Sequence, residues 1–244
     1  MIATKRVPLT RVLIKLSGEA LAGSAGSGLD AETLKYIARE IAAVHAEDVQ
    51  VAVVVGGGNF IRGDAFSSAG GIDRAVADQM GMLGTIMNSL ALQSAIEAQG
   101  VPTRVQSAIS ISQVAENFIR RRAIRHLEKG RVVVFAAGTG NPYFTTDTAA
   151  VLRALEIEAN ALVKATKVDG VYDKDPKRFN DAKRYDAITF EEAISQKLAV
   201  MDQTAFTMCQ EHNLPVIVLD FNRPGALLRA IQGADEGTFV GGKS

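Results

Sequence analysis

Short apolar runs alternate along the chain with segments in which apolar residues recur every three or four positions. The runs are rich in valine and isoleucine and largely continuous, which is typical of strands buried on both faces of a parallel sheet. The segments between them have the period of helices that pack one face on such a sheet. The runs lie at residues 12–16, 49–55, 101–105, 132–135, 161–165, 215–219 and 238–240.

This alternation predicts the α/β class, as a three-layer αβα sandwich with a mainly parallel central sheet and helices on both faces. No linker, repeat or low-complexity segment interrupts the 244 residues, so we expect a single domain with its structured core at about residues 11–240. Local helix signals fit this prediction. Asp30 is placed to cap one helix, and Thr189 with Glu192 makes a capping box for another.

The longest helical segment, at residues 72–99, is apolar on more than one side. The stripe that we expect to face the sheet or another subunit consists of Val76, Met80, Leu83, Met87 and Leu90. Further apolar surface comes from Met82, Ile86 and Ala91, and Gly81 and Gly84 allow another backbone to approach. A helix with two apolar faces must bury the second one against another surface, of this subunit or of a partner.

Residues 131–158 contain the most informative transition from strand to helix. An apolar run at residues 132–135 is followed by Gly138, Thr139 and Gly140, and then by a turn at Asn141 and Pro142. Thr145, Thr146 and Asp147 then open a helix. Backbone N–H groups and the positive end of the helix dipole converge there, which favours binding of an anion such as phosphate.

Similar loops follow three other strands. In a parallel sheet the carboxyl ends of the strands share one edge, so these loops are expected to lie together. Glycine lets a backbone approach phosphate oxygens, and lysine and arginine neutralise their charge. Such a collection, without an obvious nucleophile, favours phosphoryl transfer. The loops contain residues 15–19, residues 56–59 with Arg62, and residues 164–170.

Charge and composition exclude several classes. Lys plus Arg and Asp plus Glu both number 27, so there is no overall basic field to collect nucleic acid or an anionic membrane. The cluster Arg120–Arg121–Arg122 is more typical of a solvated helix face, or of an internal contact, than of a nucleic-acid site. No apolar run approaches the length of a membrane span, there is no signal-peptide core, and the single Cys209 cannot form an internal disulfide. We therefore expect a cytoplasmic protein.

Two motifs suggest other chemistry but lack their structural context. Residues 237–244 match the P-loop pattern letter for letter, but no helix follows to direct its dipole at a phosphate. The glycines at 56–58 follow a strand without completing the dinucleotide-binding pattern, which disfavours a dehydrogenase. None of the three histidines has a Cys or His at metal-ligand spacing, so no protein-bound metal is expected.

Four motifs together resemble the amino acid kinase superfamily and, within it, the bacterial-type uridylate (UMP) kinases. They read KLSGE, VVVGGGNFIRG, AAGTGNPYFTTD and KATKVDGVYDKDP, and the resemblance extends from about residue 11 to residue 237. It implies an αβα subunit that transfers the γ-phosphate of ATP to UMP with Mg²⁺, giving UDP and ADP, in pyrimidine biosynthesis.

The resemblance also implies roles for particular residues. The implied catalytic residues are Lys15, Asp147 and Lys164, with Lys167 as an alternative to Lys164 as the second charge neutraliser. The implied ATP-binding residues are Lys15, Leu16, Ser17, Gly18, Gly58, Arg62, Thr166, Tyr172 and Asp175. The implied UMP-binding residues are Gly57, Asp78, Thr139, Gly140, Asn141, Pro142, Tyr143, Phe144, Thr145 and Thr146. A carboxylate at Asp78 could accept hydrogen bonds from ribose hydroxyls.

Regulation and assembly are expected from the same resemblance. It implies a homohexamer that GTP activates and UTP inhibits, with GTP activation assigned to the loop Gly23, Ser24, Ala25, Gly26, Ser27 and Gly28. Two alternatives stay open. One is a carbamate or amino-acid kinase of the same superfamily, and the other is a non-catalytic protein that stores oxyanions or senses nucleotides.

Overall fold

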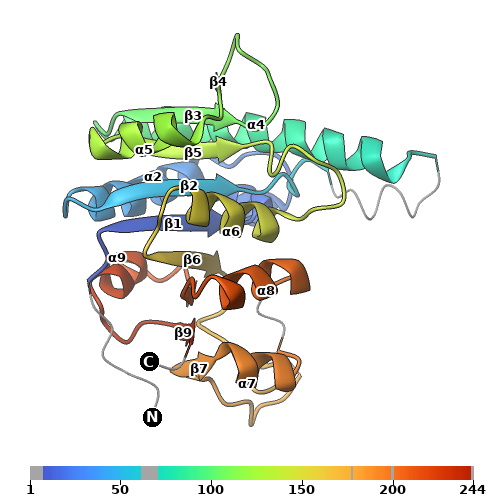
Figure 1. The fold of residues 1–244 in the computed structure, drawn as a ribbon, viewed down its shortest axis with the longest axis vertical. Helices are drawn as coiled ribbons and strands as arrows, with labels where there is room; N and C mark the ends of the chain where they lie inside the picture. The colour runs from blue at the N-terminus through green and yellow to red at the C-terminus, as the bar shows by residue number, and fades with distance from the viewer. Residues whose placement is uncertain (1–7, 62–70, 177, 199–200, 243–244) are drawn as a thin grey trace.

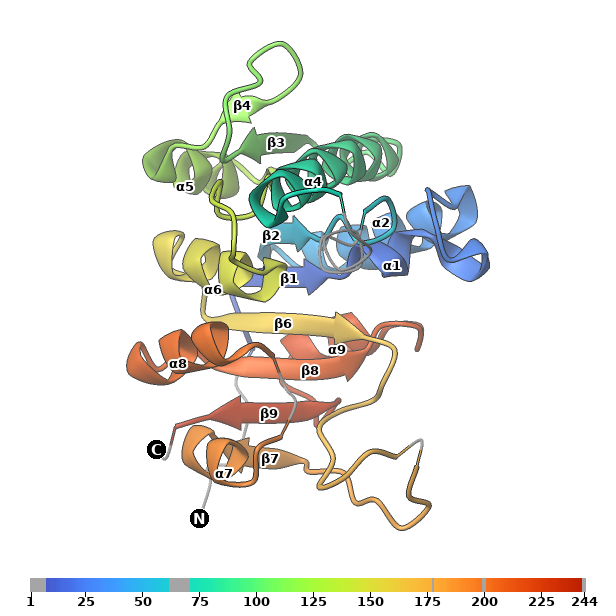
Figure 2. The same cartoon turned by 90° about the vertical axis from the view of Figure 1, so that its right-hand side faces the viewer.

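The computed structural model describes residues 8–61, 71–176, 178–198 and 201–242. Within these residues nine strands form one sheet in the order β4-β3-β5-β2-β1-β6-β8-β9-β7, which can be followed in Figure 1 and Figure 2 together, since β8 is labelled only in Figure 2. Neighbouring strands are parallel except β8 and β9, which are antiparallel. The strands are β1 (Arg11–Leu16), β2 (Gln50–Val55), β3 (Thr103–Ser107), β4 (Glu116–Asn117), β5 (Val132–Ala136), β6 (Ala161–Thr166), β7 (Ala187–Thr189), β8 (Val216–Asp220) and β9 (Thr238–Gly241).

Helices cover both faces of the sheet, so the predicted three-layer sandwich is confirmed. One face carries α2 (Ala31–His45), α4 (Arg74–Glu97) and α9 (Ala226–Ile231). The opposite face carries α5 (Arg120–Glu128), α6 (Thr146–Glu156), α7 (Phe190–Ser195) and α8 (Gln203–Glu211). Asp30 caps α2, and Thr189 and Glu192 form the capping box of α7, as the sequence predicts.

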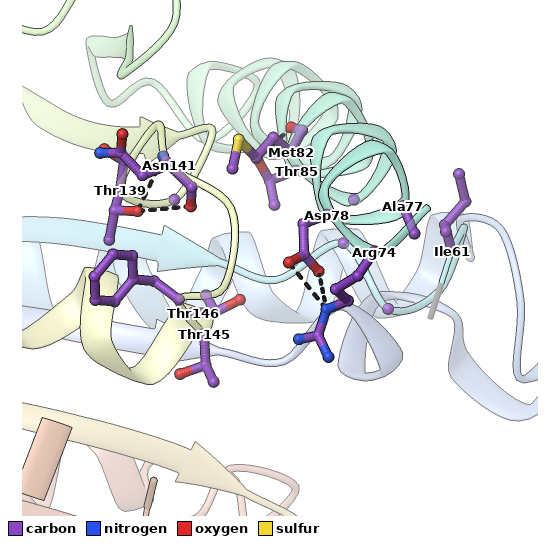
Figure 3. Close-up of a pocket in the computed structure, with 15 residues that line it drawn as sticks. Ile61, Arg74, Ala77, Asp78, Met82, Thr85, Thr139, Asn141, Thr145 and Thr146 are labelled. Atoms are coloured by element: carbon purple, nitrogen blue, oxygen red, sulfur yellow. Dashed lines mark hydrogen bonds and ion pairs between the residues drawn. The ribbon is translucent and has the colours of Figure 1, made fainter. Parts of the chain in front are cut away.

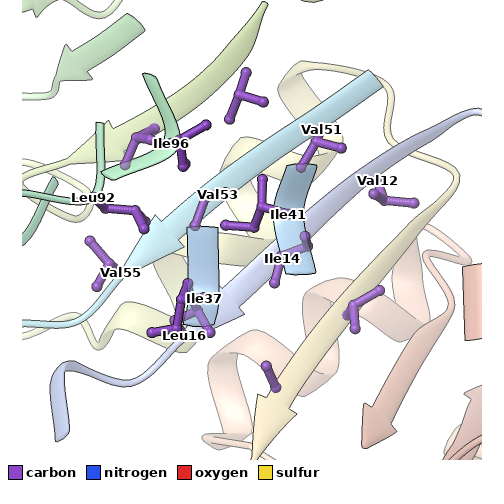
Figure 4. Packing of buried hydrophobic residues seen from close by; sticks show 14 of the residues in the cluster. Val12, Ile14, Leu16, Ile37, Ile41, Val51, Val53, Val55, Leu92 and Ile96 are labelled. Atoms are coloured by element: carbon purple, nitrogen blue, oxygen red, sulfur yellow. The ribbon is translucent and has the colours of Figure 1, made fainter. Parts of the chain in front are cut away.

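Alternate residues of the central strands enter two cores. Ile14 and Leu16 of β1 pack with Ile37 and Ile41 of α2 on one face, whereas Leu13 belongs to the opposite core. Figure 4 shows the first of these cores, with α2 lying over β1 and β2. Because both faces are buried, the central strands are apolar over most of their length, and this is why their sequences do not alternate. Among the described residues, no helix is long and apolar enough to cross a membrane.

The structure decides which of the two apolar faces of α4 lies on the sheet. Val76, Leu83 and Met87 of the predicted stripe are 46%, 49% and 52% exposed. The face on the sheet instead contains Met82 and Ile86 together with small and polar residues. Gly84 does allow the predicted close approach, since a Cβ there would lie 3.3 Å from the carbonyl oxygen of Gly57. Helix α4 therefore has two apolar faces, and the stripe with Val76, Leu83 and Met87 is the one that lies away from the sheet.

Candidate active site

Two lysines meet at the centre of the carboxyl edge. Lys15 of β1 and Lys164 of β6 are register partners on neighbouring parallel strands, so their side chains leave the same face of the sheet. The carboxylate of Asp147, in the first turn of α6, lies between them. Its Oδ1 is 2.8 Å from Nζ of Lys15 and its Oδ2 is 2.8 Å from Nζ of Lys164. The structure thus brings together the residues predicted to be catalytic.

The three charged side chains are largely buried and carry a net positive charge. The side chains of Lys15 and Asp147 are each 13% exposed, and that of Lys164 is 16% exposed. Burial raises the pKa of Asp147, but the charges of Lys15 and Lys164 outweigh it and the pKa is lowered overall. Burial lowers the pKa of Lys164; Asp147 opposes this and the charge of Lys15 adds to it, and the net shift is downward. Two ammonium groups share one carboxylate, which leaves a positive site suited to an anion.

The start of α6 is fixed by hydroxyl groups. The side chain of Thr145 accepts hydrogen bonds from the backbone N–H groups of Asp147 at 3.1 Å and Thr148 at 3.2 Å. The hydroxyls of Thr145 and Thr148 both donate to the carboxylate of Asp202, which also caps α8 by accepting from the N–H of Ala205 at 2.9 Å. Asp202 therefore ties the helix that presents Asp147 to the neighbouring helix α8.

The sequence gives no sign of this role for Asp202. It lies 54 residues from Thr148, and locally it reads only as an ordinary N-cap of the next helix. The side chain can serve both purposes because a carboxylate has two oxygens that each accept more than one hydrogen bond.

A cavity of about 250 Å³ opens between α4 and the loop that follows β5. Figure 3 shows Asp78 pointing from α4 toward Thr145 and Thr146, with Thr139 and Asn141 on the opposite wall. Gly58, predicted to bind ATP, also lines this cavity. Gly140, Pro142 and Tyr143 lie in the same loop but do not line the cavity. The predicted UMP-binding residues that line it are Gly57, Asp78, Thr139, Asn141, Phe144, Thr145 and Thr146.

Asp78 holds the loop as well as facing this cavity. Its Oδ2 accepts the backbone N–H of Tyr143 at 2.8 Å, and both carboxylate oxygens lie 3.0 Å from Nε of Arg74. Tyr143 has a φ of 71°, so this hydrogen bond stabilises a left-handed backbone that a bulky residue rarely adopts. Arg74, which also lines the cavity, is a cation that the sequence analysis missed. Its spacing of four residues from Asp78 in a helix was the available signal.

A second cavity, of about 590 Å³, is bordered by Lys164 and shares no lining residue with the first. Its walls include Lys164 and three residues predicted to bind ATP, namely Thr166, Tyr172 and Asp175. Residues 196–198, which directly follow α7, complete part of the wall and were not predicted. Lys164 thus borders this larger cavity, and Thr146, next to Asp147, borders the smaller one.

The glycines after β1 and β2 serve two purposes. A Cβ on Gly18 would lie 2.6 Å from the N of Gly58, and a Cβ on Gly57 would lie 2.4 Å from the O of Gly81. Glycine is therefore required at those two positions by close backbone packing, of Gly18 against the loop after β2 and of Gly57 against helix α4. Around Gly58 the nearest atoms are those of Glu19 at 3.9 Å, so here the space is open to a ligand.

The remaining predicted residues lie around this centre. Leu16 is buried, and Ser17 caps the short helix α1 (Gly18–Leu21). Lys167 is exposed and lines a separate cavity of about 130 Å³, so Lys164 is the lysine that faces Asp147. In the loop at residues 23–28, Gly26 and Gly28 have left-handed φ values of 74° and 70° and open surroundings. Arg62 lies outside the described residues.

Comparison with known proteins places this geometry in a family. The chain matches the amino acid kinase family over residues 10–220 and belongs to that family. It is 55% identical over 241 residues to the uridylate kinase PUMPKIN, chloroplastic, of Arabidopsis thaliana, covering 98% of this chain and 71% of that protein.

Solved structures agree with this assignment. The UMP kinase from Bacillus anthracis has a TM-score of 0.94 at 40% identity, with 97% of this chain and 98% of that chain covered. The UMP kinase from Ureaplasma parvum has a TM-score of 0.89 at 38% identity, with 95% and 98% covered.

Proposed function

We propose that this chain is a UMP kinase, which transfers the γ-phosphate of ATP to UMP and gives UDP and ADP in pyrimidine nucleotide biosynthesis. One observation carries the proposal: a single carboxylate, Asp147, holds Lys15 and Lys164 at 2.8 Å, with Lys164 bordering one cavity and Thr146, next to Asp147, bordering the other. Two relatives with this fold, from Bacillus anthracis and Ureaplasma parvum, are named UMP kinases, and the Arabidopsis relative is named a uridylate kinase.

The larger cavity is the proposed ATP site and the smaller cavity is the proposed UMP site. Phosphoryl transfer then takes place beside the lysine pair, whose ammonium groups neutralise charge on the transferred group as the bond to ADP breaks. Asp147 keeps both lysines pointing to one place. The N-terminus of α6, fixed by Thr145, adds the positive end of the helix dipole.

Mg²⁺ enters this proposal as a complex with ATP. Among the described residues no group of three or more His, Cys, Asp or Glu side chains could hold a metal ion. The carboxylate of Asp147 is engaged by two lysines, and that of Asp202 by two threonines. These residues do not fit a protein-held ion, whereas Mg²⁺ commonly binds through substrate phosphates.

Assembly and regulation are further parts of the proposal. The exposed apolar face of α4, with Val76, Leu83 and Met87, supports a homo-oligomer, and the family resemblance favours a hexamer. GTP as an activator acting through residues 23–28, and UTP as an inhibitor, rest on that resemblance. A cytoplasmic location stays a prediction, since the Arabidopsis relative is named chloroplastic. Light scattering with and without GTP tests assembly and its response.

A coupled assay of ADP release tests the activity. The purified chain is given ATP and Mg²⁺ with UMP, CMP, carbamate or small amino acids in turn. We expect UMP to be the preferred acceptor. Preference for carbamate or an amino acid would assign the chain to another branch of its family. If none of these acceptors gives turnover and metal-oxo anions co-purify with the chain, the storage or sensing alternative is favoured.

A further inference from the structure

Two polar side chains lie on the face of α4 that packs against the sheet. Thr85 is 5% exposed and Asn88 is 0% exposed, and they lie among the apolar residues Met82, Ile86 and Leu92. Burying a polar group costs free energy unless hydrogen bonds replace those it made with water. Apart from the carbonyl oxygen of Met82, to which Thr85 donates within the helix, their partners lie in two loops that border the proposed substrate sites.

Asn88 bonds to the loop that follows β2. Its Nδ2 donates to the carbonyl oxygen of Gly56 at 2.7 Å and to Oδ1 of Asn59 at 2.7 Å. Asn59, itself buried, donates to Oδ1 of Asn88 at 3.0 Å and to the carbonyl oxygen of Gly28 at 2.6 Å. This pair of amides fixes the segment that contains Gly57 and Gly58. Gly18, near Lys15, packs against the same segment.

Thr85 lies one turn earlier and bonds to the loop that follows β5. Its hydroxyl donates to the carbonyl oxygen of Met82 at 2.7 Å and accepts the N–H of Ala137 at 2.7 Å. Ala137 has a φ of 63°, a left-handed conformation that alanine rarely adopts without support. The residue starts the loop that carries Thr139 and Thr146, so the hydroxyl fixes the origin of one wall of the smaller cavity.

We propose that Thr85 and Asn88 are positioning residues, through which α4 sets the loop after β2 and the loop after β5 relative to each other. The inference rests on the proposed UMP kinase function. Phosphoryl transfer depends on positioning more than on covalent chemistry, so small displacements of these loops reduce the rate. Thr85 holds the loop after β5 and also lines the smaller cavity, so its loss should raise the KM for UMP, and a separate readout on the loop is needed to distinguish positioning from direct contact. Asn88 holds the loop after β2, at residues 56–59, against which Gly18 near Lys15 also packs. Its loss should therefore lower kcat.

The test uses Thr85→Val, which keeps the side-chain shape and removes the hydroxyl, and Thr85→Ser, which keeps the hydroxyl. Ser89→Ala is the matched control, because the buried hydroxyl of Ser89 donates only to the carbonyl oxygen of Thr85 within the helix, at 2.7 Å. We expect Thr85→Val to raise the KM for UMP by about tenfold or more while the KM for ATP changes by less than about twofold, as for loss of one buried hydrogen bond. Thr85→Ser should restore the KM, and Ser89→Ala should leave both values unchanged.

Hydrogen exchange measured by mass spectrometry gives a second readout that does not require activity. Thr85→Val should increase exchange in peptides covering residues 137–146, and Asn88→Ala should do so in peptides covering residues 56–61 and lower kcat. If Asn88→Ala does not fold, Thr85→Val alone decides the question. Unchanged exchange at residues 137–146 in Thr85→Val would overturn the inference, even with a raised KM for UMP, because Thr85 would then act by lining the cavity and not by positioning the loop. Absence of UMP-dependent ADP release by the wild type would instead overturn the proposed function.

Discussion

The two cavities beside Asp147 are held by different kinds of interaction. The smaller cavity, the proposed UMP site, has walls anchored by buried hydrogen bonds from α4, such as those of Thr85 to Ala137 and Asn88 to Gly56. The larger cavity, the proposed ATP site, is bordered by a surface segment at residues 169–186, whose two ends bond to β9 and whose outer part has exposed ion pairs. Lys174 and Asp181, for example, pair at 2.6 Å with side chains 34% and 77% exposed.

This difference predicts unequal sensitivity to substitution. A buried hydrogen bond that loses one partner leaves the other group unsatisfied, whereas an exposed ion pair exchanges its partner for water at little cost. We therefore expect the UMP side to be rigid and selective and the ATP side to tolerate change. The predictions below run from the residues between the cavities, where effects should be largest, to the surface of the ATP side.

Lys15→Ala should cause the largest loss of activity. The ammonium group lies where charge develops during transfer, and removal of one such preorganised group typically lowers kcat by about 10²–10³-fold. We expect the affinity for UMP, measured by calorimetry, to change little, because the group acts mainly in the transition state. Lys35→Ala is the control, since Lys35 is an exposed lysine that pairs with Glu32. A loss of UMP affinity with turnover intact would mean that Lys15 belongs to the UMP side.

Asp147→Asn should lower the free energy of unfolding by about 3 kcal/mol at neutral pH, because it leaves two buried lysines without a counter-charge. The pKa of Asp147 is lowered from 3.8 in the folded protein, so its carboxylate stabilises the fold above that value. This contribution is lost as the pH falls through the lowered pKa. The difference between wild type and variant in urea unfolding should therefore shrink from pH 6 to pH 3. A constant difference would contradict the linkage.

Asp202→Ala should have an intermediate effect, about 1–2 kcal/mol of stability, because it removes an N-cap and the acceptor for two threonine hydroxyls. Since the same carboxylate fixes the start of α6, kcat should also fall. Asp30→Ala removes the N-cap of α2, which bonds to the N–H of Thr33 at 2.7 Å, and serves as the matched control. Thermal unfolding and kinetics are measured for both. If Asp202→Ala and Asp30→Ala lose the same stability and have the same kinetics, Asp202 acts only as the N-cap of α8.

Asp181→Asn should have the smallest effect. It removes only the exposed partner of Lys174, so we expect a change of less than about 0.5 kcal/mol in the free energy of unfolding. The KM for ATP should change by less than about twofold. Steady-state kinetics at low and high salt measures both the change and its screening. A tenfold rise in the KM for ATP would break the comparison, because it would show that the surface segment positions its ligand as strictly as the buried one.

The sequence predicts the order of elements from local signals, and the family resemblance implies the central trio, with Lys167 left open as an alternative to Lys164. Apolar runs reveal the strands, and parallel strands bring Lys15 and Lys164 to one edge whatever the details of packing. The Thr-Thr-Asp cap at residues 145–147 likewise marks the start of α6. Each of these features is specified within a few residues of the chain.

The features that the sequence does not reveal depend on partners far along the chain. Helix α4 is apolar on two faces, so its periodicity could not decide which face lies on the sheet. The choice becomes clear only when Thr85 is seen to bond to Ala137, 52 residues away, and Asn88 to Gly56, 32 residues away. Asp202 was missed for the same reason, since its partners Thr145 and Thr148 belong to another helix.

Strand β9 gives the ATP side a further property. It lies between β8 and β7 in the sheet, and the hydroxyl of Thr238 accepts the N–H of Val171 at 2.9 Å while the N–H of Phe239 donates to Asp186 at 3.0 Å. β7 and both ends of the segment at residues 169–186 therefore depend on residues that the ribosome adds about fifty positions after β7. During synthesis the strands beside the proposed UMP site can pair first, since β1, β2, β3 and β5 come early in the chain. The segment at residues 169–186, which borders the proposed ATP site, lacks its bonds to β9 until β9 has emerged from the ribosome. Until then the proposed ATP site of a nascent chain is incomplete.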